Sequence, residues 1–208
     1  MHWVDFWTPD AWARKFGGKK LTTKKGESRL LTPGEISMVT SLFKTAITVT
    51  SVRVYNDTRL PFQSKFGYAV TPRGAIYWPE DAFKEDYSVE DIWRIHWFIH
   101  EMTHVWQYQM GMCVMCRGVL NKITPYEYKL TPEKLLSDYN MEQQAAIISD
   151  YYLLDKYGCD TWSKRSKEKN KGKSFKNGKI KLFYWLDAYK QCLYLFLKNP
   201  KDKKALFG

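Results

Sequence analysis

Apolar side chains recur at three- and four-residue spacing in three long stretches of the chain, and this periodicity predicts three helices. The first covers about residues 89–110 and is apolar on most of its faces, which is typical of a helix buried in a domain core. The second begins at Ser137 or Asp138 and ends at Gly158. The third covers residues 182–197 and stops at Asn199-Pro200.

Local signals refine the ends of the first helix and place two more. Ser88 is a suitable N-cap for helix 89–110, with Asp91 at its third position and Gly111 as a natural stop. Thr32-Pro-Gly-Glu35 starts another helix, which we expect to reach about Phe43, because Pro suits the first position and Glu suits the third. A short helix is also expected over residues 9–16.

Strand patterns lie between residues 49 and 78. Residues 49–55 are rich in β-branched side chains and predict one strand. Residues 67–70 and 75–78 flank Thr71-Pro-Arg-Gly74, and this arrangement predicts a hairpin. Prolines in residues 111–136 argue against a long regular element there. We therefore predict an α+β fold, in which a small antiparallel or mixed sheet packs on the buried helix 89–110 and further helices.

Length and composition suit one domain with a real core, because the chain has 208 residues of which 44% are hydrophobic. We expect an N-terminal arm over residues 1–30 and a domain over residues 31–208, with a basic loop at 163–181 and a C-terminal helix at 182–198. No apolar run approaches the length of a membrane helix, about 18 residues, and the first residues lack the apolar stretch of a signal peptide.

The net charge of +11 is concentrated near the C-terminus. Residues 159–208 hold 14 basic and 4 acidic residues, so the rest of the chain is near neutral. Such a segment attracts anionic partners such as a cell-wall polymer, anionic lipid, nucleic acid or an acidic protein. A solvated loop followed by a helix is the simpler explanation, and nucleic acid is the partner we expect least.

The four cysteines do not form a recognisable metal or redox motif. Cys113 and Cys116 are spaced as C-x-x-C, but a zinc ribbon needs a second such pair and the chain has none. We expect free thiols at all four positions, with a disulfide as the alternative in an oxidising compartment.

The strongest chemical signal is His100-Glu-Met-Thr-His104 within the most apolar helix. Residues four apart share one face of a helix, so both imidazoles can bind one metal ion. Glu101 follows the first histidine and can act as general base on a water, which is the arrangement of zinc metallopeptidases. The alternative is a pair of structural histidines near a glutamate, but polar groups in so apolar a helix need partners that a metal supplies.

A catalytic zinc site needs a third protein ligand. Glu127 and Glu133 lie in a proline-flanked segment, whereas Glu142 lies in the first turn of the second helix, where a carboxylate is held more rigidly. We assign Glu142, against the alternative that it only complements the helix dipole. His96, one turn before His100, is expected to be a structural histidine, because a fourth ligand would close the site.

Four further side chains are candidates for supporting roles. Asp138 or Asp150 can accept a hydrogen bond from a ligand histidine. Tyr108 or Tyr139 can stabilise the oxyanion of a tetrahedral intermediate, and the sequence does not choose between them.

The segments His100-Glu-Met-Thr-His-Val-Trp-Gln107 and Leu136-Ser-Asp-Tyr-Asn-Met-Glu-Gln-Gln-Ala145 resemble the zincin-like metallopeptidase domains attached to VgrG and Rhs proteins of bacterial type VI secretion systems. The resemblance covers roughly residues 30–157. It implies a zincin-like fold, Zn²⁺ held by His100, His104 and Glu142, and Glu101 as catalytic base. One departure from thermolysin-like enzymes is Ala146, which stands where they have an aspartate.

The resemblance also implies an antibacterial effector with a protein or peptide-containing substrate, a VgrG/Rhs-type delivery protein and an immunity protein. We expect synthesis in the cytoplasm, delivery by type VI secretion and action in the periplasm of the target cell. Two other readings stay open. One is a peptidoglycan amidase that uses the same zinc site, and the other is a non-catalytic anion- or partner-binding protein with a zincin core.

Overall fold

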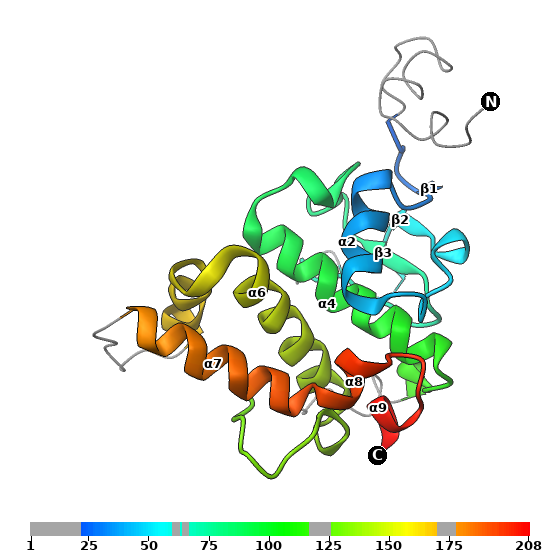
Figure 1. Cartoon of the computed structure of the whole chain (residues 1–208). Helices are drawn as coiled ribbons and strands as arrows, with labels where there is room; N and C mark the ends of the chain where they lie inside the picture. Colours follow the sequence, from blue (N-terminus) through cyan, green and yellow to red (C-terminus); the bar gives the residue numbers. More distant parts are fainter. Residues whose placement is uncertain (1–21, 60–62, 64–66, 117–125, 170–177) are drawn as a thin grey trace, which may run out of the picture.

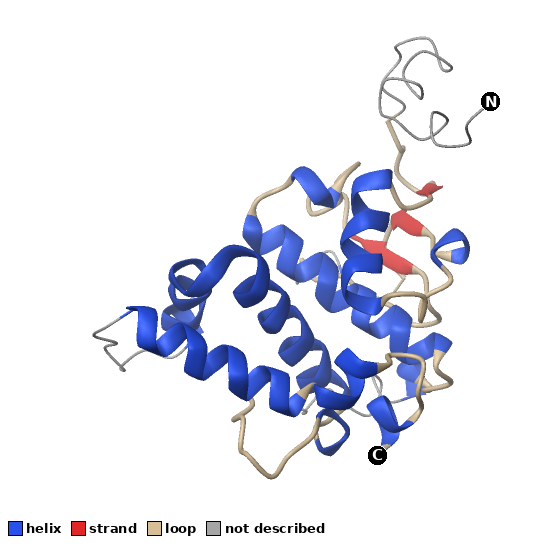
Figure 2. Cartoon of the chain, in the orientation of Figure 1, coloured by secondary structure: helices blue, strands red, loops and turns tan. Residues whose placement is uncertain are grey.

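The predicted buried helix 89–110 forms the central helix of the structure, α4 (Ile92–Gln109). The computed structural model describes residues 22–59, 63, 67–116, 126–169 and 178–208. Within them, α6 (Met141–Lys169) packs along α4, and α7 (Gly178–Cys192) packs along α6 (Figure 1). Helix α2 (Pro33–Phe43) and a small sheet lie on the other side of α4 (Figure 2). The predicted α+β class is confirmed.

The sheet has three short strands in the order β1 (Ser28–Arg29), β2 (Val54–Asn56) and β3 (Ile76–Trp78). Strand β1 runs antiparallel to β2, and β2 runs parallel to β3. Residues 28 and 29 fall in the expected arm but belong to this sheet. The predicted hairpin is present as a single antiparallel bridge, in which Val70 and Tyr77 exchange backbone hydrogen bonds.

The predicted strand 49–55 is too long. Val49–Ser51 form a 3₁₀ turn, and only the end of the segment joins the sheet. Ser51 donates its hydroxyl hydrogen bond to the carbonyl of Thr48, which offers the backbone an alternative to strand pairing.

Two predicted helix caps are wrong and one is right. Thr32 and Glu35 form the expected capping box at α2. Helix α4 is capped by Asp91, whose carboxylate accepts from the amides of Trp93 and Arg94, because Ser88 lies in a preceding 3₁₀ turn, η3 (Tyr87–Val89). Likewise η4 (Leu136–Asp138) precedes α6, where Asn140 and Gln143 exchange side-chain-to-amide hydrogen bonds instead.

The C-terminal elements also differ from the prediction. Gly158 breaks the helical backbone with φ 79°, as expected, but the helix resumes to Lys169, so the predicted loop 163–181 begins and ends in helix. The predicted helix 182–198 is divided into α7 and α8 (Tyr194–Lys198), and a short α9 (Lys204–Phe207) follows. In the described part of the chain, no helix is both long and apolar enough to cross a bilayer.

The prediction of free thiols is wrong for one pair. Cys113 and Cys116 form a disulfide directly after α4, whereas Cys192 is a buried free thiol, whose pKa is raised to about 12 by burial and by the charge of Asp138. The side chain of Cys159 and the expected helix over residues 9–16 lie outside the described residues.

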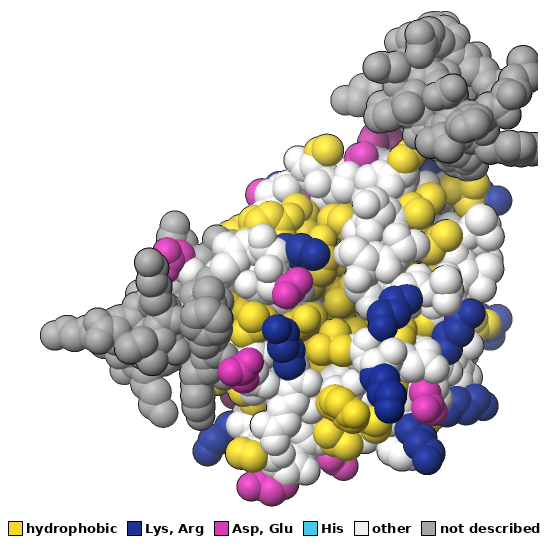
Figure 3. All heavy atoms as spheres, viewed as in Figure 1, with side chains coloured by type: hydrophobic (Ala, Val, Ile, Leu, Met, Phe, Trp, Pro, Cys, Tyr) yellow, Lys and Arg dark blue, Asp and Glu magenta, His cyan; other side chains and the backbone are white. Residues whose placement is uncertain are grey.

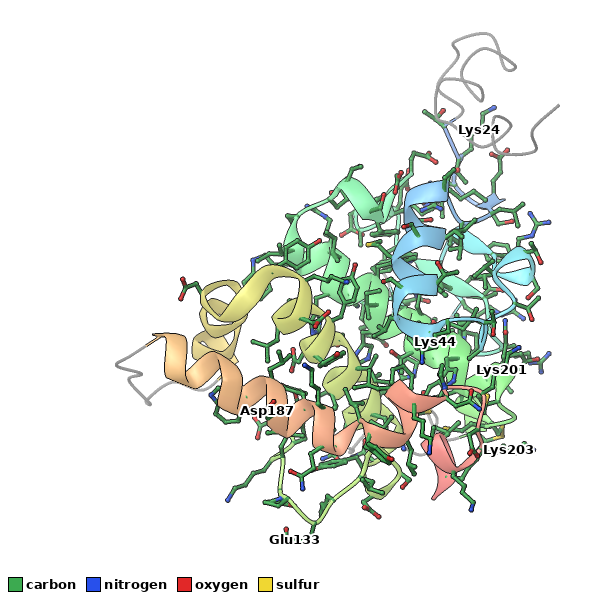
Figure 4. All side chains as sticks on the ribbon, in the orientation of Figure 1. Lys24, Lys44, Glu133, Asp187, Lys201 and Lys203 are labelled. Atoms are coloured by element: carbon green, nitrogen blue, oxygen red, sulfur yellow. A yellow bond between two sulfur atoms is a disulfide. The ribbon has the colours of Figure 1, made fainter. Side chains whose placement is uncertain are left out.

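Part of the basic charge gathers over α8 and α9. Figure 3 shows several Lys and Arg side chains on this side of the molecule, and Figure 4 places Lys44, Lys201 and Lys203 there. Lys44 extends from the end of α2 and donates to the carbonyls of Leu197 and Lys198 at the end of α8. All three of these lysines are exposed.

A buried ion pair joins the sheet to α2. Both terminal nitrogens of Arg29 bind the carboxylate of Glu35 at 2.7 Å, and this carboxylate also accepts from the amides of Thr32 and Tyr87. The side chain of Glu35 is fully buried. One carboxylate therefore holds β1, the start of α2 and η3 in register.

We predict that Glu35→Ala lowers the free energy of unfolding by about 3–5 kcal/mol, because it leaves the Arg29 guanidinium without its partner in a buried position. Urea denaturation followed by circular dichroism measures the effect. Glu80→Ala is the matched control, since Glu80 pairs with Lys25 at the surface and its loss costs under about 1 kcal/mol. Equal losses in the two variants would contradict this account.

Candidate metal centre

Two facing helices bring together the three predicted metal ligands. His100 and His104 lie on one face of α4, and their Nε2 atoms are 3.2 Å apart. Glu142, in the first turn of α6, places Oε2 3.2 Å from each of these nitrogens. A tetrahedral zinc ion about 2.0–2.1 Å from its ligands holds them about 3.3 Å apart, so this triangle matches the spacing of a zinc site.

The hydrogen bond on the other side of His104 indicates which nitrogen faces the centre. Nδ1 of His104 lies 2.7 Å from Oε1 of Gln107. The amide nitrogen of Gln107 donates to the carbonyl of Met141 and to Gln144, and these two bonds orient its oxygen toward His104. Since an amide oxygen only accepts, Nδ1 carries a proton, and Nε2 of a neutral His104 presents a lone pair to the centre.

The electrostatics of the cluster favour opposite charges on His104 and Glu142. Burial disfavours a charged His104, but the charge and hydrogen bond of Glu142 outweigh burial and raise the pKa of His104 to about 9. Burial alone would raise the pKa of the Glu142 carboxyl, but the charges and hydrogen bonds of the two histidines hold this pKa well below the usual range. Without a metal ion, a proton therefore sits where the ion would bind.

The expected base, Glu101, lies beside this triangle and is held by the sheet edge. Its Oε2 accepts a 2.6 Å hydrogen bond from the hydroxyl of Thr71, and both side chains are buried. Thr71 follows Val70, whose backbone is bridged to β3. The strand next to α4 therefore sets the direction in which the carboxylate points.

The supporting residues proposed from the sequence lie elsewhere. Asp138 accepts from the amide of Leu135 in η4. Asp150 lies 2.8 Å from Nε2 of His96 and also accepts from the hydroxyl of Tyr128. Asp150 therefore orients His96, which is not one of the three residues of the triangle. The role expected of these aspartates is filled for His104 by Gln107.

The two proposed oxyanion donors are also placed away from the triangle. Tyr108 packs against Gly74 on the outside of the turn after Val70, and the hydroxyl of Tyr139 donates to the carbonyl of Lys129. Glu127 and Glu133, the other carboxylates considered as ligands, are exposed.

A cavity of about 370 Å³ opens beside His100 and Glu101. Tyr126 lines it, with its ring centroid 6.0 Å from that of His100. Partial burial, together with the charges of Glu142 and Glu101, raises the pKa of Tyr126 to about 12, so its hydroxyl stays protonated at neutral pH.

Three residues at this site were not predicted from the sequence, namely Thr71, Gln107 and Tyr126. Only Gln107 had a signal in the sequence, since a residue three positions after His104 shares its helix face.

The chain is similar in sequence and in structure to part of a known bacterial protein. No family model matches the chain. The sequence is 40% identical over 144 residues to the type VI secretion system spike protein VgrG2b of Pseudomonas aeruginosa, a match that covers 65% of this chain and 14% of that protein. The structure is similar to the effector domain of P. aeruginosa VgrG2b, with a TM-score of 0.57 and 37% sequence identity. This match covers 71% of this chain and 87% of the domain.

We predict one zinc ion per chain and the release of about one proton when it binds at pH 7, because His104 is protonated below its raised pKa and must lose that proton to bind metal. The affinity should therefore rise between pH 6 and pH 8. Calorimetry in two buffers with different ionisation enthalpies measures the proton count. His104→Ala and Glu142→Ala should lose the ion, whereas the control Glu133→Ala should keep it. Zinc retained in all three variants would rule out this ligand set.

Proposed function

Because the chain belongs to the family of the VgrG2b effector domain, we propose that it is a zinc-dependent metallopeptidase with a zincin-like fold that acts as a type VI secretion effector. The observation that carries the enzymatic part is the triangle of His100, His104 and Glu142 with Glu101 beside it. A non-catalytic binding protein has no need of a buried general base next to a metal triad.

The triad and the base divide the chemistry between them. Zinc held by His100, His104 and Glu142 would supply a Lewis acid and make water a stronger nucleophile near neutral pH. Glu101 accepts the proton of the attacking water and returns it to the leaving amine. Thr71 holds one oxygen of Glu101, which leaves the other oxygen to face the water. Thr71 is in this sense a positioning residue.

The oxyanion of the tetrahedral intermediate needs a donor from the protein. Tyr126 is better placed for this role than Tyr108 or Tyr139, because it lines the cavity that His100 and Glu101 share. Its phenol is protonated at neutral pH, as an ordinary tyrosine is, and can donate a hydrogen bond.

The similarity to the VgrG2b spike protein supports a proposal for how the domain is delivered and which proteins it meets. The chain spans 14% of the VgrG2b spike protein, so the properties of that whole protein do not transfer directly. We propose that a VgrG/Rhs-type protein delivers the domain, that the target-cell periplasm is where it acts, and that an immunity protein protects the producer. The exposed lysines over α8 and α9 favour an acidic partner, since complementary charge speeds association.

We predict that Glu101→Gln keeps the fold and bound zinc but lowers hydrolysis by about 10²–10⁴-fold, because proton transfer is lost while the ligands are untouched. The zinc-loaded protein is incubated with an unfolded protein and, separately, with purified peptidoglycan, each with and without a chelator. Chelator-sensitive cleavage of the protein alone supports a peptidase, and cleavage of peptidoglycan alone supports the amidase. Hydrolysis by Glu101→Gln at the parent rate would show that this carboxylate is not the base.

The same variant tests the compartment. Expression of the parent in the periplasm of a susceptible bacterium should arrest growth, whereas cytoplasmic expression and periplasmic Glu101→Gln should not. Toxicity only on cytoplasmic expression would show that the domain acts in the cytoplasm and not in the periplasm. Absence of toxicity in both compartments would count against an effector.

We predict that Thr71→Val lowers kcat by about 10–100-fold with little change in KM, because the isosteric side chain removes the donor that orients Glu101. Thr71→Ser keeps the hydroxyl and should restore most of the activity. Steady-state kinetics with zinc content measured in parallel distinguishes orientation of the base from damage to the metal centre. If Ser is as poor as Val, the hydroxyl is not what matters.

A further inference from the structure

We propose that the cavity beside the metal centre binds a bulky apolar, preferably aromatic, side chain next to the scissile bond. This inference rests on the proposed peptidase function and narrows its substrate class from any peptide to unfolded or flexible protein segments with such residues.

The position of the cavity ties it to the reaction. His100 and Glu101 form part of its lining, so a group seated in it lies next to the atoms that these residues would act on. At about 370 Å³ it falls within the range of cavities that bind small ligands, and it can hold one large side chain.

Its walls are mostly aromatic. Tyr68, Trp93, Trp97 and Tyr126 line it, and Trp93 and Trp97 are one turn apart on α4. Three of the ten large apolar side chains that are exposed within the described part of the chain are Tyr68, Trp93 and Tyr126. Aromatic side chains that keep exposed surface at one cavity are typical of a binding site, because a ligand seated there adds apolar contact area to each.

The charge of the cavity disfavours acidic groups. The described residues of its lining include no Lys or Arg, and Glu101 contributes a carboxylate. The imidazole of His96 lines the cavity but is paired with the buried carboxylate of Asp150. A substrate carboxylate seated in the cavity would lie beside the carboxylate of Glu101, and like charges repel in a partly buried site. Peptidoglycan stem peptides carry such carboxylates, so the cavity favours protein segments over the cell wall.

Two basic residues line a cavity on another part of the molecule. A second cavity, of about 540 Å³, is lined by Arg73 and Lys201 and by polar groups such as Thr48. Figure 4 shows Lys201 near Lys44 and Lys203, over α2, α8 and α9. Arg73 and Lys201 therefore line a cavity other than the one beside His100 and Glu101.

Ala146 controls the depth of the cavity. It lies one turn after Glu142 on α6, it is 2% exposed and it forms part of the lining. A methyl group at this position leaves space that a longer side chain would fill. Ala146→Leu should therefore shorten the cavity without a change to any ligand.

The test is to digest an unfolded protein mixture with the zinc-loaded chain, map the cleaved bonds by mass spectrometry, and measure kcat/KM on peptides that differ at one position. We expect Phe, Tyr, Trp, Leu or Met on one fixed side of the cleaved bond, and about tenfold or greater preference for Phe over Ala and over Glu. Ala146→Leu and Trp93→Ala should each reduce this preference about tenfold, whereas Tyr194→Ala, an exposed aromatic on α8, should not change it.

The outcomes separate the two proposals. Cleavage with no side-chain preference, with a preference for acidic residues, or with a preference for Lys or Arg stacked on the aromatic rings overturns the inference and leaves the peptidase intact. A preference that survives in Ala146→Leu and Trp93→Ala, with zinc content and circular dichroism unchanged, also overturns it. Failure to cleave any peptide overturns the proposed function, and the inference with it.

Discussion

The contact between α4 and α6 is the interaction on which the rest of the structure depends. Helix α4 is buried along most of its length and, besides His96, it carries the two imidazoles of His100 and His104, a carboxylate and a glutamine into the interior. Each of these groups costs free energy unless a partner meets it there. Helix α6 supplies most of the partners, with Glu142 against the two histidines and Gln144 against Gln107.

The remaining partners come from the opposite side of α4. The edge of the small sheet brings Thr71 to Glu101, and Arg29 with Glu35 joins that sheet to α2. The aromatic side chains of Phe43, Trp106 and Phe196 pack together at the C-terminal part of α4, and the indole of Trp106 donates to the carbonyl of Pro200. Glu101 is thus held from the side of the sheet, and His100 and His104 are met from the side of α6. Both sides pack on α4.

Charge and chemistry are separated on this molecule. The cavity beside the candidate metal triangle is lined mostly by aromatic side chains and one carboxylate, while the exposed lysines gather over α8 and α9 (Figure 3). An apolar ligand and an acidic partner would therefore meet different surfaces of the molecule.

The sequence by itself determined the elements and residues whose signals are local. The spacing of His100 and His104, the carboxylate in the first turn of the next helix, and the Thr32 capping box depend on helix periodicity and backbone hydrogen bonding, which act over three or four residues. The start of α4 was predicted wrongly, because Ser88 and Asp91 are both suitable N-cap residues and lie within one turn of each other.

Only the tertiary structure decided which side chains complete the site. Thr71 and Tyr126 lie 30 residues before Glu101 and 26 after His100, and no local rule brings such residues together. Asp138, Asp150, Tyr108 and Tyr139 had suitable chemistry, but the packing of each element turned them to other partners. The disulfide between Cys113 and Cys116 likewise depends on the turn after α4. Helix periodicity specifies which face a residue occupies, whereas the direction of approach of the next element decides what that face meets.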